Sequence, residues 1–532
     1  METKQTYDAI VIGAGSAGCV ATRRLVDAGL RVLLLEAGPP DNSQFIHIPA
    51  TFVRVIGTHR TWVYESTPQQ HAHGRTMYVP QGKTLGGGSS VNAMVYIRGQ
   101  HQDYDDWAAQ GCAGWDWKSV LPWFKKAESN QVFSAAWHGT DGPLTVSETR
   151  HRHVLSEAFI KAAQESGIPH NADFNGAQQA GVGFYQTTTR NGARASTAVT
   201  YLDPVRSSPR LYLETGALVQ KITFDGTRAT GVVWRNARGE LVESLASREI
   251  VLAAGALASP KLLMLSGIGP GAHLQALGIP VVQDLTGVGQ NFQDHLEVSV
   301  YGRCKEPISM AGNDVGLRAL RHGIQWKLTR TGLLTSNVVE SGGFVDTAGT
   351  GRPDIQFHVL PALVGDVDRE PLPGHGISIN PCFLRPKSRG TVALSSPDAA
   401  APVHFDGGFL TEQADVDTLV RGVQLARRIL RAPSLSKLIS VELSPSAEKD
   451  VPAAELESYV RSRAKTVYHP AGTCRMGAAS DSHTVVTSDL KVRGIQGLRV
   501  CDASVIPNLV SGNTNAPVVM IAERCADFML AK

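Results

Sequence analysis

Two continuous apolar runs near the start of the chain predict strands that are buried on both faces. Residues 7–12 (YDAIVI) and 30–35 (LRVLLL) are rich in β-branched and aliphatic side chains, and residues 16–28 between them form a small-residue helical pattern. A third buried strand is predicted at 249–253, followed by a helix at 259–266. Buried strands that alternate with helices are typical of a parallel sheet.

Other parts of the chain show a different periodicity. Residues 211–240 predict an antiparallel meander with turns at FDGT and NARG, and the segments IQFHVLPAL, GISINPCFL and GTVALSS alternate like strands of a second antiparallel sheet. Residues 415–431 predict an amphipathic helix and residues 518–530 a buried one. The expected fold class is therefore α/β, a Rossmann-like domain with an inserted α+β domain built on an antiparallel sheet. The predicted boundaries are 1–155, 190–300 and 460–532 for the first domain, and 156–189 and 301–459 for the second.

The turn after the first strand predicts a dinucleotide site. It reads GAGSAG, with Gly13, Gly15 and Gly18 in GxGxxG spacing, and the second strand ends in Glu36. In this arrangement the glycines admit a pyrophosphate at a helix N-terminus, and the acid can accept hydrogen bonds from ribose hydroxyls. A purely structural strand–helix–strand unit is the alternative. The motif leaves open whether the ligand is NAD or FAD.

Composition bears on whether the chain binds nucleic acid, metal ions or membranes. The 532 residues are 42% hydrophobic and 19% charged, with a net charge of +3, and without a run of Lys or Arg the chain is not expected to bind nucleic acid. The seven cysteines lack CxxC or Cys/His metal spacing, so we expect no metal site and mostly buried thiols in a reducing compartment. No signal peptide pattern or membrane-length apolar run stands out. The expected location is the cytoplasm, and peripheral contact with the inner face of a membrane stays open.

A glycine cluster at residues 82–99, GKTLGGGSSVNAMVYIRG, offers consecutive unobstructed backbone amides. Such a backbone can wrap a flat ligand or form an anion-binding nest, and a flexible linker is the alternative. The apolar segment 91–97 follows immediately, which indicates that the glycine cluster is an ordered part of the fold and not a flexible linker.

Four separated motifs resemble the glucose–methanol–choline (GMC) oxidoreductase family, flavoenzymes that oxidise alcohols. They are GAGSAG with its acid, GKTLGGGSSVNAMVYIRG, GALASPKLLMLSGIG from residue 255, and YHPAGTCRMG at residue 468 with the later SGNTNAP loop. The resemblance extends from Tyr7 to Asp527. It implies FAD as the cofactor and an alcohol as the substrate.

The resemblance also implies roles for individual residues. The ADP half of FAD is expected to contact three sets of residues: the pyrophosphate contacts Gly13, Gly15, Ser16, Ala17 and Gly18, the adenosine ribose contacts Glu36, and adenine contacts Val219. The isoalloxazine is expected to contact Gly88, Asn92, Ala93 and Val95, and its pyrimidine end Asn515 and Pro517. The ribityl and phosphate groups are expected to lie near Asp502 and Ala503. Some relatives attach FAD through a histidine immediately before the signature asparagine. That position is Val91 here, so non-covalent FAD is expected.

The expected catalytic pair is His469 and Asn513. Alcohol oxidation needs a base for the hydroxyl proton, and imidazole titrates near the working pH. The Asn513 amide can donate to the developing alkoxide. Some relatives carry a second histidine where this chain has Asn513, which places the chain nearer the choline and aliphatic alcohol dehydrogenases.

The predicted reaction is FAD-dependent oxidation of a primary alcohol or polyol to the aldehyde or ketone, by a dehydrogenase or an oxidase. Glu340 matches a carboxylate of choline-oxidising relatives and is expected to bind substrate, with a structural ion pair to a nearby arginine as the alternative. A choline dehydrogenase or oxidase is therefore a second reading. A hydroxynitrile-type lyase and a non-catalytic flavin-binding protein are two others. Oxygen, a quinone or another acceptor is left open as the oxidant.

Overall fold

The computed structural model describes residues 5–134, 136–365 and 372–531, and its first sheet combines parallel and antiparallel strands. The strand order is β11 (Leu211–Thr215), β2 (Val32–Glu36), β1 (Gln5–Ile12), β14 (Leu241–Leu252), β13 (Arg228–Arg235) and β12 (Leu218–Asp225), and β26 (Leu498–Val500) also pairs with β14. Strands β11, β2, β1, β14 and β26 run parallel, whereas β12, β13 and β14 form an antiparallel meander. The carboxyl ends of β1 and β2, where the nucleotide turn and Glu36 follow, meet at one edge of this sheet.

The prediction of an antiparallel meander was wrong for residues 211–215. These residues form β11, which pairs in parallel with β2 in register from Leu211 opposite Val32 to Thr215 opposite Glu36. Strand β2 is fully buried, so its backbone needs a partner at both edges, and β1 supplies only one of them. The predicted strand at 249–253 is the buried end of β14, which continues directly from the meander.

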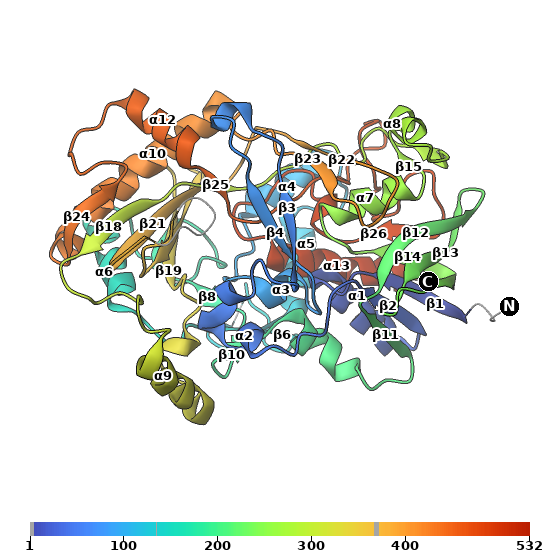
Figure 1. The fold of residues 1–532 in the computed structure, drawn as a ribbon, viewed down its shortest axis with the longest axis horizontal. Coiled ribbons are helices and arrows are strands. Elements are labelled where there is room, and N and C mark those ends of the chain that lie inside the picture. The colour runs from blue at the N-terminus through green and yellow to red at the C-terminus, as the bar shows by residue number, and fades with distance from the viewer. Residues whose placement is uncertain (1–4, 135, 366–371, 532) are drawn as a thin grey trace.

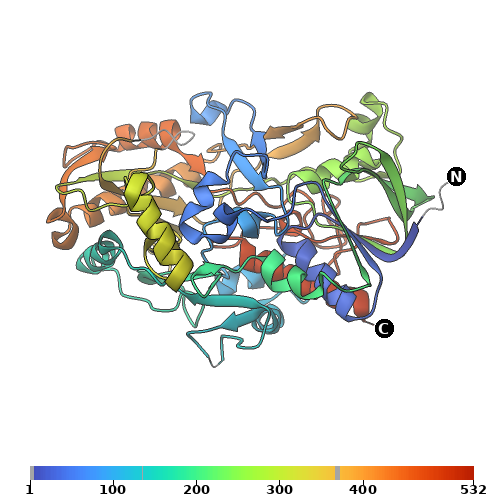
Figure 2. The same cartoon turned by 60° about the horizontal axis from the view of Figure 1, so that its bottom comes forward.

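Two helices from opposite ends of the chain cover this sheet together. Helix α1 (Ser16–Asp27) and helix α13 (Asn515–Leu530) pack side by side, as Figure 2 shows. Arg24 of α1 and Glu523 of α13 form a two-point ion pair, at 2.8 and 2.7 Å. The C-terminal segment therefore lies against the first strand–helix unit.

The second sheet is antiparallel and lies beside the first (Figure 1). Its order is β24 (Ile439–Ser444), β18 (Val300–Cys304), β21 (Gly376–Phe383), β20 (Ile355–Leu360), β19 (Ser341–Val345) and β7 (Gly181–Phe184), with β17 (Leu296–Glu297) and β25 (Lys465–Thr466) attached to it. Helices α6 (Val154–Glu165) and α10 (Gln413–Leu430) pack with Ile355, Phe357 and Val359 in one apolar cluster. Because side chains alternate along a strand, Gln356 and His358 occupy the opposite, polar face.

The α/β fold class and the amphipathic helix at 415–431 are confirmed, and one strand assignment is corrected. Residues 391–394 form β22, which pairs with β23 (Val403–Asp406) in a separate ribbon and not in the second sheet. The predicted domain boundaries stay a prediction. All seven cysteines are free and buried. Among the described residues, no helix has both the length and the apolar content that a bilayer-spanning segment needs.

Candidate active site

The turn between β1 and α1 presents free backbone donors. Helix α1 begins at Ser16, and its N-cap residue Gly15 supplies no side-chain hydrogen bond. A Cβ atom at Gly18 would lie 1.8 Å from the carbonyl oxygen of Gly13, so only glycine lets the helix pack this closely on the turn. With no acidic residue in its first turn, the helix N-terminus is suited to an anionic ligand such as a diphosphate.

The second glycine cluster packs directly on this turn. The amide of Gly86 donates to the carbonyl of Ala14 at 2.7 Å. Gly87 has a φ of +50°, and a Cβ atom added there would lie 2.6 Å from the Cα atom of Gly15. Gly88 is exposed although residues 84–91 around it are buried. Two segments some seventy residues apart therefore line one space with exposed backbone.

The C-terminal segments close the same space from another side. The Asn515 amide at the start of α13 donates to the Ser16 hydroxyl at 2.8 Å, so the N-termini of α1 and α13 converge. Neither terminus has a side-chain cap. The carboxylate of Asp502 accepts hydrogen bonds from the Gly255 amide (2.9 Å) and the Ser259 hydroxyl (2.5 Å). The predicted FAD contacts thus come together as free amides and small residues, and this donor set fits a bound flavin dinucleotide.

Glu36 lies at the end of β2, against the nucleotide turn. Its carboxylate is buried and accepts from the amides of Ala14 (2.9 Å) and Gly38 (2.8 Å). Burial raises its pKa to about 7, against the stabilising effect of these two donors. Val219, on β12, is buried beyond the end of β2. The ribose and adenine contacts of these two residues stay predictions.

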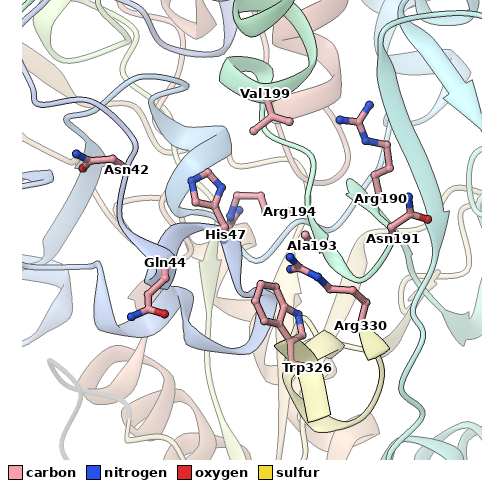
Figure 3. Close-up of a pocket in the computed structure, with 10 residues that line it drawn as sticks. All are labelled: Asn42, Gln44, His47, Arg190, Asn191, Ala193, Arg194, Val199, Trp326 and Arg330. Carbon is pink, nitrogen blue, oxygen red and sulfur yellow. The ribbon is translucent and has the colours of Figure 1, made fainter. Parts of the chain in front are cut away.

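Arg194, which sequence reasoning missed, holds the signature asparagine in place. Its guanidinium donates to the Asn92 side-chain oxygen and to the Ser89 carbonyl, both at 2.9 Å, and to the Ile46 carbonyl at 2.7 Å. Burial lowers the pKa of Arg194 to about 9, and its Nη2 atom has no partner. Its local sequence, NGARAS, carries no pattern that marks it. Figure 3 shows the Arg194 side chain at a cavity of about 560 Å³ that is also bordered by Trp326 and Arg330.

The structure brings the two predicted catalytic residues together. The Nδ2 atom of Asn513 lies 3.3 Å from the Nε2 atom of His469, and both side chains keep some accessible surface. The backbone amide of His469 donates to the carboxylate of Asp294 at 2.8 Å, which fixes the loop that carries the imidazole. The imidazole of His469, a possible base, and the amide of Asn513, a hydrogen-bond donor, are therefore close enough to contact the same substrate group.

A second histidine determines which nitrogen of His469 is free. The Nε2 atom of His295 lies 3.0 Å from the carbonyl oxygen of Leu384, and its Nδ1 atom lies 3.0 Å from Nδ1 of His469. A carbonyl can only accept, so we place a proton on Nε2 of His295, which leaves Nδ1 of a neutral His295 as an acceptor. Nδ1 of His469 then carries a proton, and Nε2 of His469 is the unprotonated nitrogen, whose lone pair accepts from the Asn513 amide at 3.3 Å.

The electrostatics favour the neutral form of both rings. Burial lowers the pKa of His295 to about 4. The pKa of His469 is held well below its ordinary value by burial and by its proximity to His295 and His358. Burial also raises the pKa of Asp294 well above its usual range. A neutral His469 can accept a proton, whereas a protonated one cannot.

A hydrogen bond from Gln356, on the polar face of the second sheet, sets the orientation of the Asn513 amide. Gln356 donates to the Asn513 side-chain oxygen at 3.1 Å and lies 3.3 Å from the hydroxyl of Tyr185. That hydroxyl donates in turn to the Phe357 carbonyl at 2.6 Å. Because Oδ1 of Asn513 accepts from Gln356, its Nδ2 group faces His469.

Glu340 is fully buried and well satisfied. Its carboxylate accepts from Ser336 (2.6 Å), Ser156 (3.0 Å) and the amide of His153 (2.7 Å), and lies 2.7 Å from Nδ1 of His151. Burial alone would raise its pKa, but these partners hold it below the ordinary value. The expected structural partner was an arginine, and the structure gives a histidine and two serines. The substrate contact of Glu340 stays a prediction.

Comparison with known proteins agrees with this geometry. Two models of the GMC oxidoreductase family match the chain, one over residues 7–297 and one over residues 386–522. An alcohol dehydrogenase [acceptor] of Pseudomonas putida is 43% identical over 99% of this chain and 96% of its own length. A mitochondrial choline dehydrogenase of Mus musculus is 42% identical over 99% of this chain and 90% of its own.

Solved structures share the whole fold. Pyridoxine 4-oxidase from Mesorbium loti superposes with a TM-score of 0.87 at 30% identity, covering 98% of each chain. A formate oxidase variant from Aspergillus oryzae superposes with a TM-score of 0.92 at 25% identity, covering 99% of each chain. The likeness therefore includes both sheets and not the nucleotide-binding part alone.

Proposed function

The chain belongs to the GMC oxidoreductase family of FAD-dependent enzymes that act on alcohols, and from that premise we propose that it oxidises a primary alcohol or polyol to the aldehyde or ketone. The observation that carries the proposal is the unprotonated Nε2 atom of His469, which accepts from the Asn513 amide at 3.3 Å. This pair can bind one hydroxyl group from two sides. A flavin-binding protein without catalysis does not need both groups there. A hydroxynitrile-type lyase also needs a base for a hydroxyl proton, but it would not reduce the flavin.

In the proposed reaction His469 is the general base. Nε2 accepts the hydroxyl proton, and the proton on Nδ1 stays in the hydrogen bond to His295. Asn513 donates from Nδ2 to the substrate oxygen and stabilises the negative charge that develops there. Gln356 keeps that amide in the donating orientation. When bound, FAD supplies the acceptor for the hydride of the alcohol carbon.

The FAD site is assigned to the segments that converge on the nucleotide turn. When FAD is bound, the free amides of α1 would hold its pyrophosphate, and Gly88, Asn92, Ala93 and Val95 would contact the flavin. We propose non-covalent attachment, because Val91 offers no nucleophile at the position before Asn92. The uncapped N-terminus of α13 favours negative charge at the pyrimidine end, near Asn515 and Pro517.

The polar face of the second sheet supports a hydroxylated substrate. His358 lies opposite Asn380 on the neighbouring strand, and both contact the carboxylate of Glu297, at 2.9 and 3.0 Å. Hydroxyl groups can exchange hydrogen bonds with side chains of this kind. Choline is the second candidate, favoured by the similarity to choline dehydrogenase and weakened by the four chain partners that already satisfy Glu340.

The test is anaerobic bleaching of the bound flavin by a panel of choline and of aliphatic, aromatic and sugar alcohols. We expect at least one primary alcohol or polyol to bleach the flavin, and acid precipitation to leave all the flavin in the supernatant. Dye reduction and oxygen uptake, measured in parallel, identify the acceptor. Bleaching by choline alone would replace the proposed substrate class, and no bleaching by any alcohol would contradict the proposed reaction.

Substitution of Gly87 by alanine should weaken FAD binding by about 10-fold, because the new Cβ atom clashes with Gly15 and overpacking of this kind costs about 1–3 kcal/mol. The measurement is the flavin retained per chain after gel filtration and the Kd for added FAD. Gly226→Ala is the matched control, since Gly226 also has a positive φ, +56°, but open space around it. Equal FAD affinity in the two variants would contradict the assigned site.

A further inference from the structure

Helix α9 (Gly316–Thr329) lies on the outside of the molecule and buries none of its residues (Figures 1 and 2). Four large apolar side chains on it are open to solvent. The exposed fractions are 84% for Leu317, 59% for Leu320, 50% for Ile324 and 77% for Leu328. Their spacing of three and four residues places them in one stripe along the helix. An apolar stripe of this length on the surface indicates a binding face.

The stripe points away from the protein because α9 is attached by its opposite side. The half-buried residues of the helix are Ala319, His322, Gly323 and Trp326, which recur on the other face. The indole of Trp326 donates to the Gly192 carbonyl at 2.7 Å. The Arg330 guanidinium stacks 3.7 Å from the centre of the Trp326 ring. The attached face therefore carries Trp326 and three smaller residues, and the large aliphatic side chains lie on the outward face.

All the charged residues from 315 to 331 are basic. Arg318, Arg321 and Lys327 lie on the two sides of the apolar stripe, and Arg330 follows the helix. The nearest acid, Asp314, precedes the helix and is paired with Arg54 at 3.3 Å. Cations that flank an apolar stripe match a surface that is anionic outside and apolar beneath.

We propose that α9 docks this protein on the surface of an anionic phospholipid bilayer. The leucine and isoleucine side chains enter the region between headgroups and acyl chains, and the flanking cations contact the phosphates. Val315, 63% exposed at the start of the helix, extends the apolar face. A second copy of the chain is a poorer occupant, because pairing α9 with itself brings like charges together. The proposal does not depend on the identity of the alcohol.

The test is co-sedimentation of the holoenzyme with phosphatidylcholine vesicles that do or do not contain phosphatidylglycerol. We expect binding to the anionic vesicles that falls as salt is added. Serine at all four stripe positions should weaken the partition coefficient at least ~10-fold, since the buried apolar surface is lost. The matched control places serine at four exposed apolar positions elsewhere: Val63, Val154, Leu241 and Val281.

A charge-reversed variant separates the electrostatic part. Arg318→Glu, Arg321→Glu and Lys327→Glu together should abolish the preference for anionic vesicles. Lys221→Glu with Arg248→Glu, on exposed strand positions, should retain it. Dye-linked activity and flavin content should be unchanged in every variant, because the substituted side chains lie outside the candidate active site. The proposal is overturned if the wild type does not bind anionic vesicles, or if the stripe variant binds them normally. It is also overturned if the stripe variant only converts a dimer to a monomer.

Discussion

Replacing His469 by alanine should slow reduction of the flavin by an alcohol at least ~100-fold, the lower end of the usual contribution of a general base. The hydrogen bonds of His295 leave the Nε2 atom of His469 unprotonated and therefore able to accept a proton, and alanine removes this atom. The measurement is single-turnover flavin bleaching under anaerobic conditions. His483→Ala is the control, because that imidazole is 62% exposed on the surface. Near-normal bleaching by the His469 variant would remove this residue from the mechanism.

The pH profile of the same reaction gives an independent check. Neutral His469 is the active form, and burial together with His295 and His358 lowers its pKa. A lowered pKa keeps the ring neutral to more acidic pH. The acid limb of kcat/KM should therefore lie below the ordinary imidazole value of 6.5. An acid limb at or above that value would contradict the electrostatic account of the site.

Replacing Glu128 by glutamine should lower the free energy of unfolding by about 3–5 kcal/mol, the cost of leaving a buried charge unpaired. Arg98, at the end of the signature segment, and Glu128 are both fully buried and lie 2.5 Å apart. Burial alone would raise the pKa of Glu128, but Arg98 and His138 hold it below its ordinary value. Glutamine keeps the shape of the side chain and removes the compensating charge.

The measurement is urea unfolding followed by tryptophan fluorescence. Glu148→Gln is the matched control, because the pair of Glu148 with Arg152 at 3.2 Å is about half exposed on both sides and exposed pairs contribute at most about 1 kcal/mol. If the two variants lose equal stability, burial does not govern the contribution of the Arg98 pair.

The parallel part of the fold could be predicted because its signal is local. Strands β1 and β2 are continuous apolar runs. Helix α1 lies between them in the sequence, and the glycines before it indicate a tight turn. The same kind of reasoning misplaced residues 211–215 and 391–394. A short strand shows the same alternation of apolar and polar side chains whichever strand it pairs with. Its partner is decided in the fold, by which other strand has an unpaired edge.

The sequence by itself determined the family resemblance, and it predicted the FAD-binding segments and the pair His469 and Asn513, because each depends on residue types at fixed spacing. Only the tertiary structure decided what His469 can do. His295 and Gln356 are distant in sequence, and nothing around them marks a role. Their hydrogen bonds fix the free nitrogen of the imidazole and the orientation of the amide. The outward direction of the α9 stripe was likewise decided by packing, because periodicity alone does not say which face of a helix meets the protein.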